Sequence, residues 1–128
     1  MKKPGSAAKQ MALNIDVAPT ILDLTGITIP AYIQGQSLVP ILKNPNLPGR
    51  QAWLYEYFRD FPYRVPDIRA VRTQRYKYIE HHGRKGPELF DLTADPKEMR
   101  NLIDTLKGGE ILPKLKGMME NLQKGKRL

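Results

Sequence analysis

The sequence predicts an α+β fold: about four antiparallel strands packed by a C-terminal amphipathic helix, preceded by a short helix and a long loop. Short runs of aromatic and β-branched residues recur in the second half of the chain, and such residues favour a pleated, half-buried surface. Near the C-terminus, apolar residues follow helical spacing instead. A sheet and a helix can bury these two apolar faces against each other.

The four predicted strands lie at 53–58, 68–73, 76–80 and 88–92. Only Gln74 and Arg75 separate the two middle strands, which predicts a tight hairpin. Proline-broken residues 60–67 and glycine- and proline-containing residues 83–87 make the other two connections. The strands therefore follow one another as an antiparallel meander.

The sequence Asp95-Pro96-Lys97-Glu98 predicts a helix start directly after the last strand. Asp95 can accept hydrogen bonds from exposed backbone amides, and Pro96 occupies the first helical position, where no N–H is needed. Glu98 can then reach back to the cap. We expect a strand that feeds a capped helix at this point.

Residues 14–26 predict a short helix. Asp16 is the expected N-cap, Pro19 is tolerated in the first turn, and Gly26 is a natural stop. The apolar face of this helix consists of Ile21, Leu22 and Leu24. A helix this short does not persist alone, so it must pack on another surface.

Two more segments complete the chain. Residues 27–49 form a long connection interrupted by prolines and glycines, with a helical turn predicted at 38–42. Residues 110–124 predict the C-terminal amphipathic helix, in which Pro113 fits only near the start. Its apolar stripe consists of Ile111, Leu115, Met118 and Leu122.

Composition excludes several classes of protein. The absence of cysteine excludes disulfides and cysteine-ligated metal. No apolar run approaches the roughly 18 residues needed to span a bilayer, so no membrane partner is expected. The first residues include lysines but no apolar core of an export signal, and the sequence does not indicate a cellular compartment.

The formal net charge of +8 is the main argument for a polyanionic ligand. The cations are spread along the chain in small clusters, which is typical of an ordinary solvated surface. No arginine-rich helix or zinc-finger spacing occurs, so no nucleic-acid partner is favoured.

Five blocks of sequence occur in a recognisable order: NIDVAPTILDLTGI, IQGQSLVPIL, EYF, VRTQRYKYI and ELFDLTADPKEMRNL. In this order they resemble the C-terminal part of the arylsulfatase-type, formylglycine-dependent sulfatases, over residues 14–102. The resemblance implies a parent with a large α/β domain of alkaline-phosphatase type and a smaller C-terminal antiparallel-sheet subdomain. On this basis residues 1–45 correspond to the end of the large domain, and residues 46–128 form the subdomain.

The resemblance also implies which catalytic groups this chain lacks. The family forms its formylglycine from the first residue of a Cys/Ser-x-Pro-x-Arg motif and uses a divalent metal, usually calcium. Ser6 and Ser37 are not followed by proline and arginine at the required positions, and no Asp-Asp pair is present. We therefore expect no catalytic residue and no cofactor in this chain, with calcium bound only in the intact parent.

His81 and His82 are the only histidines. Neighbouring residues on a strand point to opposite faces, so this pair cannot readily chelate one metal, and a structural or solvent-facing role is the main interpretation. In complete sulfatases, however, loops of the small subdomain border the substrate cleft. The resemblance therefore makes His81, His82, Arg84 and Lys85 candidate substrate-facing residues.

The central hairpin carries four cations: Arg69, Arg72, Arg75 and Lys77. We expect them to pair across the sheet with Glu56, Glu80 or Glu88, with anion contact as the alternative. No basic or nucleophilic partner that would make Asp91 part of an acid–base pair can be identified in the sequence, so Asp91 is interpreted as structural.

The sequence thus predicts a C-terminal fragment of a sulfuric ester hydrolase that is inactive alone. The alternative is a stand-alone basic module that binds sulfated polysaccharide or nucleic acid. The expected partner is the missing N-terminal sulfatase domain. Without that domain, exposed apolar faces should drive self-association or partial disorder.

Overall fold

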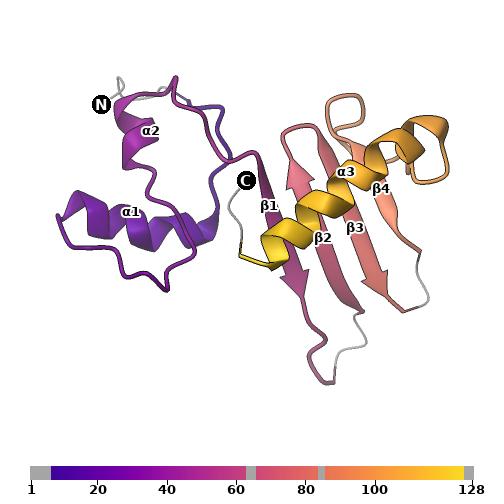
Figure 1. Cartoon of the computed structure of the whole chain (residues 1–128), viewed down its shortest axis with the longest axis horizontal. Helices are drawn as coiled ribbons and strands as arrows, with labels where there is room; N and C mark the ends of the chain where they lie inside the picture. Colours follow the sequence, from indigo (N-terminus) through magenta and orange to yellow (C-terminus); the bar gives the residue numbers. More distant parts are fainter. Residues whose placement is uncertain (1–6, 63–65, 84–85, 126–128) are drawn as a thin grey trace. The chain divides into compact units, whose positions relative to one another are not determined.

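The structure is a computed structural model that describes residues 7–62, 66–83 and 86–125 (Figure 1). The chain divides into two compact units, Met1–Arg50 and Gln51–Leu128, called here unit 1 and unit 2. Each unit is described by itself. Within the described residues, no helix has both the length and the apolar character needed to cross a bilayer.

Unit 1 contains a 3₁₀ turn, η1 (Asn14–Asp16), followed by the helices α1 (Val17–Leu24) and α2 (Val39–Lys43). Both predicted helical segments are therefore present. Gly26 follows the end of α1 with a φ of 73°, a conformation that glycine adopts without strain. Asp16 does occupy the N-cap position of α1, but its carboxylate makes no capping hydrogen bond with that helix.

Unit 2 contains a four-stranded antiparallel sheet in the order β1-β2-β3-β4. The strands are β1 (Ala52–Tyr57), β2 (Asp67–Thr73), β3 (Tyr76–His82) and β4 (Glu88–Asp91). All four agree with the predicted meander, and Gln74 and Arg75 form its tight hairpin turn. Thr73 closes this turn, because its hydroxyl accepts from the backbone amide of Tyr76 at 2.8 Å.

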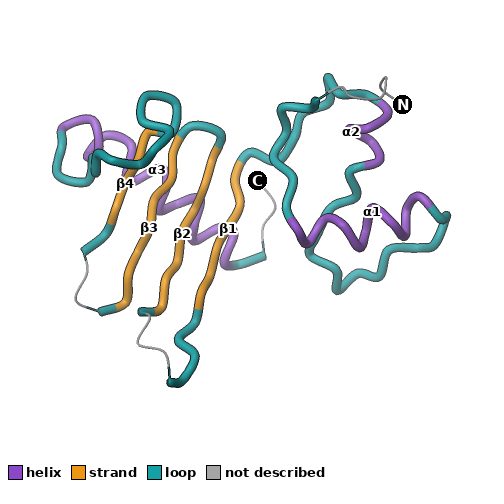
Figure 2. Tube along the Cα trace, turned by 180° about the vertical axis from the view of Figure 1, so that it is seen from behind, coloured by secondary structure: helices purple, strands orange, loops and turns teal. Residues whose placement is uncertain are grey.

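The C-terminal helix α3 (Leu106–Gln123) lies across one face of the sheet (Figures 1 and 2). Its buried residues Leu115 and Met119 form one core with Val71, Tyr78 and Leu89 of the strands. The helix begins earlier than predicted, because the Thr105 hydroxyl caps it by accepting from the Gly108 amide at 3.0 Å. Pro113 consequently lies inside the helix rather than near its start.

The predicted helix start at Asp95 is wrong. Residues 92–105 form turns and irregular backbone, and Glu98 has a φ of 54°, which no right-handed helix allows. The Asp95 carboxylate accepts from the Arg100 amide at 2.7 Å, and the Glu98 carboxylate accepts from the Lys77 ammonium at 2.6 Å. Both side chains are thus engaged in ways that a capping box does not permit.

The strands alternate between two faces of the sheet. Ala52, Val71, Tyr78 and Leu89 belong to the core under α3. Tyr78 also donates a hydrogen bond to Glu80 at 2.9 Å, and burial together with this bond raises the pKa of its phenol. The intervening residues point to the opposite face, which no helix of unit 2 covers in the described part of the chain (Figure 2).

Candidate functional site

His81 and His82 lie at the end of β3, near the connection to β4. The His81 side chain is only 6% exposed, and its Nε2 lies 3.0 Å from Oε2 of Glu88. Its Nδ1 is buried and has no hydrogen-bond partner. His82, the next residue along the strand, is exposed. The two histidines therefore occupy different environments, as strand alternation requires.

The other predicted substrate-facing residues, Arg84 and Lys85, lie outside the described residues. Within residues 7–62, 66–83 and 86–125, no group of three or more metal-ligating side chains is placed to hold an ion. Of the four predicted substrate-facing residues, the structure therefore describes two: His81, which is buried and paired with Glu88, and His82, which is exposed.

The cations of the central hairpin find different partners from those expected. Arg69 does contact Glu56, with Nε 3.5 Å from Oε1. Arg75 pairs with Asp91 and Lys77 pairs with Glu98, so the predicted glutamate partners are wrong for these two residues. Arg72 is exposed and makes no ion pair with any described residue.

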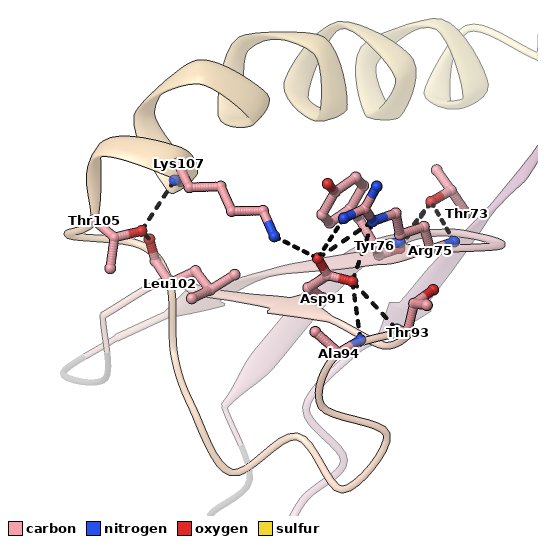
Figure 3. Close-up of polar contacts among 10 residues, drawn as sticks. Thr73, Arg75, Tyr76, Asp91, Thr93, Ala94, Leu102, Thr105 and Lys107 are labelled. Atoms are coloured by element: carbon pink, nitrogen blue, oxygen red, sulfur yellow. Dashed lines mark hydrogen bonds and ion pairs between the residues drawn. The ribbon is translucent and has the colours of Figure 1, made fainter.

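The most connected charged group of unit 2 is Asp91, at the end of β4 (Figure 3). Its side chain is 2% exposed and receives Nη2 of Arg75 at 3.0 Å and Nζ of Lys107 at 2.6 Å. The backbone amides of Thr93 and Ala94 donate to the same carboxylate at 3.2 and 3.3 Å. Asp91 therefore has two cationic partners that the sequence did not identify, Arg75 from the β2–β3 turn and Lys107 from α3, and both pair with it as charged groups.

Hydrogen bonds from Arg75 and Lys107 hold the pKa of Asp91 well below its usual range. In return, Asp91 raises the pKa of Arg75. A cavity of about 250 Å³ lies next to this cluster and is lined by Asp91, Arg100 and Lys107 among others. Because its carboxylate is already paired and is a weak base, Asp91 is suited to holding three segments together and not to accepting a proton from a substrate.

Unit 1 has its own buried carboxylate, Asp16, which is fully buried. Its two oxygens accept from Arg50 at 2.8 and 2.9 Å and from the amides of Leu13 and Gln36 at 2.8 and 2.9 Å. Burial alone would raise the pKa of Asp16, but the hydrogen bonds from Arg50, Gln36 and Leu13 outweigh it and the pKa is lowered. Asp16 therefore fastens the start of α1 to the following loop and to the end of the unit.

Neither acidic cluster was identified as such from the sequence. Arg75 and Lys107 each lie 16 residues from Asp91, and Arg50 lies 34 residues from Asp16. Residues this far apart in the sequence show no helical or strand periodicity that would identify them as partners. Both clusters are saturated by their own chain, so among the described residues the arrangement supports a structural role for them and supplies no activated nucleophile.

Known proteins resemble this chain over nearly its whole length. The sequence model of the family "N-sulphoglucosamine sulphohydrolase, C-terminal" matches residues 1–125. The N-acetylglucosamine-6-O-sulfatase of Bacteroides thetaiotaomicron is 34% identical over 128 residues, which is 95% of this chain and 23% of that protein. Arylsulfatase K of Canis lupus familiaris is 31% identical and matches 80% of this chain and 21% of that protein.

Solved structures agree. The structure of a protein in complex with its substrate D-glucosamine-2-N,6-O-disulfate superposes with a TM-score of 0.86 at 34% identity, over 95% of this chain and 26% of that chain. The phosphonate monoester hydrolase of Agrobacterium radiobacter superposes with a TM-score of 0.63 at 27% identity, over 85% of this chain and 23% of that chain.

The chain thus spans about a quarter of the length of the relatives that it matches. The resemblance to the C-terminal region of the arylsulfatase-type sulfatases is confirmed, and so is the predicted fold class. The chain belongs to the N-sulphoglucosamine sulphohydrolase C-terminal family and is homologous to the C-terminal part of sulfatases, which are sulfuric ester hydrolases.

Proposed function

We propose that this chain is the C-terminal part of a sulfatase that acts on a sulfated sugar, and that it completes the enzyme's scaffold without supplying the catalytic groups. The observation that carries the proposal is the family match over residues 1–125 combined with coverage of only 23% of the N-acetylglucosamine-6-O-sulfatase. The sugar assignment rests on the names of that relative and of the disulfated glucosamine complex.

The formylglycine and the divalent metal, calcium in the family, belong to the preceding part of the parent in this proposal. The described residues do not fit a metal site, because no three ligating side chains converge. Sulfate ester hydrolysis needs an activated nucleophile, so the isolated chain should be inactive.

The exposed surface of the first helix, α1, supports the proposal that this chain contacts the preceding part of the sulfatase. Val17, Ile21 and Leu24 recur at helical spacing along one stripe of α1, and their exposed fractions are 55%, 55% and 60%. Two polar residues of α1 bind the following loop instead. The Thr20 hydroxyl accepts from the Leu38 amide at 2.9 Å, and Asp23 accepts from the Ser37 hydroxyl.

The apolar stripe of Val17, Ile21 and Leu24 is therefore exposed, whereas Pro19 of the same helix is buried. An exposed apolar stripe of this kind marks a contact face. We assign it to the preceding part of the sulfatase, and we expect it to cause self-association when the chain is alone.

His82 is the best candidate for a direct contact with substrate, because it is exposed whereas His81 is held by Glu88. In this proposal the strand end carrying His81 and His82, with Arg84 and Lys85 after it, borders the sugar.

A chimera tests the proposal. The C-terminal segment of the Bacteroides N-acetylglucosamine-6-O-sulfatase that matches this chain is replaced by this chain, and sulfate release from N-acetylglucosamine-6-O-sulfate is measured. The chimera should turn over, and the purified chain alone should not. Turnover by the chain alone, or a folded chimera without turnover, would contradict the proposal.

The same chimera tests His82. His82→Ala should raise KM for the sulfated sugar by roughly threefold or more and leave turnover of a small aryl sulfate unchanged, since only the sugar extends to the subdomain. Equal effects on both substrates would argue against contact with the sugar.

The alternative function, a stand-alone module that binds sulfated polysaccharide, rests on the net charge of +8. It requires the isolated chain to bind heparin with an affinity that falls steeply as salt rises. Absence of retention on a heparin column at low salt would remove it.

A further inference from the structure

The connection between β1 and β2 carries two exposed aromatic side chains. Phe61 is 93% exposed and Phe58 is 62% exposed, and both lie in residues 58–62, the described part that directly follows β1. Neither ring belongs to the core under α3. A phenylalanine has no polar group that favours contact with water, so two such rings exposed in one loop mark a binding surface.

The register places this pair at the end of the sheet that carries the exposed histidine. Continuing the β1–β2 register past Tyr57 brings Phe58 opposite Asp67. Asp67 in turn pairs with His82 of β3. Neighbouring strands lie about 4.8 Å apart, so the backbones of Phe58 and His82 are separated by roughly 10 Å. The rest of the connection extends past the strand ends (Figures 1 and 2).

The base of the connection is fastened to β2. The Asp67 carboxylate accepts from the backbone amide of Arg59 at 2.5 Å, which fixes the chain next to Phe58. The guanidinium of Arg59 and the carboxylate of Asp60 stay exposed, and neither makes an ion pair with any described residue. One cation and one anion are therefore available to a ligand beside the two rings.

This combination suits a sulfated sugar. The C–H bonds on one face of a sugar ring carry a slight positive charge and pack on the negative face of an aromatic ring. The guanidinium of Arg59 can bind a sulfate or carboxylate, and the carboxylate of Asp60 can accept from hydroxyl groups. A protein surface that covered the rings would also bury both charges, which is costly unless each meets a matched partner.

We infer that Phe58 and Phe61, called here the loop platform, stack against a second sugar ring of the substrate, the one linked to the ring whose sulfate ester is cleaved. Arg59 binds an anionic substituent of that second ring. The inference rests on the proposed function, which places the cleaved sugar beside His82. Phe58 lies two strands away from His82, so the loop platform meets a neighbouring ring, and the parent enzyme favours an oligosaccharide over a monosaccharide.

Kinetics of the chimera with the Bacteroides enzyme test the inference. KM is measured for N-acetylglucosamine-6-O-sulfate and for a trisaccharide that ends in the same sulfated sugar. Phe61→Ala should raise KM for the trisaccharide about fivefold and leave kcat unchanged, because it removes a contact that substrate and transition state share. KM for the monosaccharide should not change, since the monosaccharide does not reach the loop platform. Phe61→Tyr keeps the ring and should keep both wild-type values.

Leu106→Ala is the matched control. Leu106 is 92% exposed, as Phe61 is, but it lies at the start of α3 near the other end of the sheet (Figure 1). Its replacement should leave both KM values unchanged. Phe61→Ala and Leu106→Ala should each melt at the wild-type temperature, because neither side chain is part of the core.

Saturation-transfer NMR on the isolated chain measures the stacking itself. Phe90, the one other phenylalanine of the chain, is buried, so phenylalanine ring protons near a ligand belong to the loop platform. Saturating these protons should transfer magnetisation to the C–H protons of the trisaccharide. The transfer should fall by about half or more in Phe61→Ala and persist at high salt, because stacking is not screened as ionic contacts are.

The outcomes separate the inference from the proposed function. An unchanged KM for the trisaccharide in Phe61→Ala, or an equal rise for both substrates, would overturn the inference while the turnover of the chimera leaves the proposed function standing. The equal rise would identify Phe61 as a packing contact. Transfer that disappears at high salt would show ionic binding alone and would also overturn the inference. A folded chimera without turnover would overturn both proposals.

Discussion

Asp91 joins three segments that are far apart in the sequence: the end of β4, the β2–β3 turn through Arg75, and the first turn of α3 through Lys107. Each contact ends on a carboxylate that is 2% exposed. Arg75 and Lys107 are themselves about half exposed, so they can be resolvated if the carboxylate is lost, whereas the amides of Thr93 and Ala94 lose their acceptor. The contribution of Asp91 to folding should therefore be moderate and strongly dependent on pH.

Asp91→Asn should lower the free energy of unfolding at pH 7 by about 2 kcal/mol, the order expected for hydrogen bonds to a charged group. The pKa of Asp91 is lowered in the folded state, so its contribution is complete above the ordinary aspartate value of about 4. It is lost as the pH falls toward the lower folded-state value. Urea unfolding between pH 7 and pH 2 should therefore show a smaller acid-induced loss of stability in the variant. Asp104→Asn, at an exposed position, is the control and should follow the wild type.

At the scale of elements, α3 has three glycines in different surroundings. A Cβ built on Gly108 would lie 1.9 Å from the carbonyl oxygen of Leu102, because the chain before the Thr105 cap passes close to the helix. A Cβ on Gly109 or Gly117 would meet nothing within 4 Å. Only Gly108 is therefore required by the packing of this segment.

Gly117→Ala and Gly109→Ala should each raise the free energy of unfolding by roughly 0.5–1 kcal/mol, since alanine has the better helix propensity. Gly108→Ala should lower it despite the same gain in propensity, because the backbone at Leu102 has to move. Thermal melting of the three variants measures the difference. A stabilising Gly108→Ala would show that the 102–108 segment does not pack as described.

The contacts made by the segment after β4 explain why the helix predicted at Asp95 does not form. The Asp-Pro-x-Glu pattern is compatible with a capped helix, but Lys77 pairs with Glu98 from the neighbouring strand β3, and Leu102 donates a backbone hydrogen bond to Leu89 at 2.8 Å. These tertiary contacts hold the segment next to β3 and β4. A continuous helix at 95–102 would not allow both contacts to form. Tertiary context commonly overrides propensity in this way.

Each unit has an apolar surface that its own unit leaves uncovered: the stripe of Val17, Ile21 and Leu24 in unit 1, and the sheet face opposite α3 in unit 2. A chain that is a quarter of its relatives in length would leave such faces exposed when produced alone. The association state of the isolated chain in solution should therefore depend mainly on these exposed apolar surfaces.

Sedimentation velocity should show concentration-dependent association of the isolated chain. The double change Ile21→Glu and Leu24→Glu should reduce it, because two charges then replace the apolar stripe. Leu106→Glu is the matched control: Leu106 is 92% exposed at the start of α3 and does not belong to the α1 stripe, so its replacement should leave association unchanged. A wild-type chain that stays monomeric at all concentrations would contradict the prediction.

The sequence by itself determined the four strands, the hairpin, the presence of the first and last helices, and the family of this protein. Short runs of aromatic and β-branched residues defined the strands, the spacing of Leu115 and Met118 defined the final helix, and the short Gln74-Arg75 interval defined the hairpin, because each signal lies within a few residues of chain. The blocks from NIDVAPTILDLTGI to ELFDLTADPKEMRNL defined the family, because both their residues and their order can be recognised along the chain itself.

Only the tertiary structure decided which charges meet and which faces stay uncovered. Arg75 and Lys107 converge on Asp91 because the turn of one hairpin and the start of α3 reach the same end of the sheet. Thr20 and Asp23 bind residues that lie 18 and 14 positions further along the chain, and Ile21 of the same helix stays exposed. Interactions of this kind depend on distances through space, and one-dimensional spacing does not encode them.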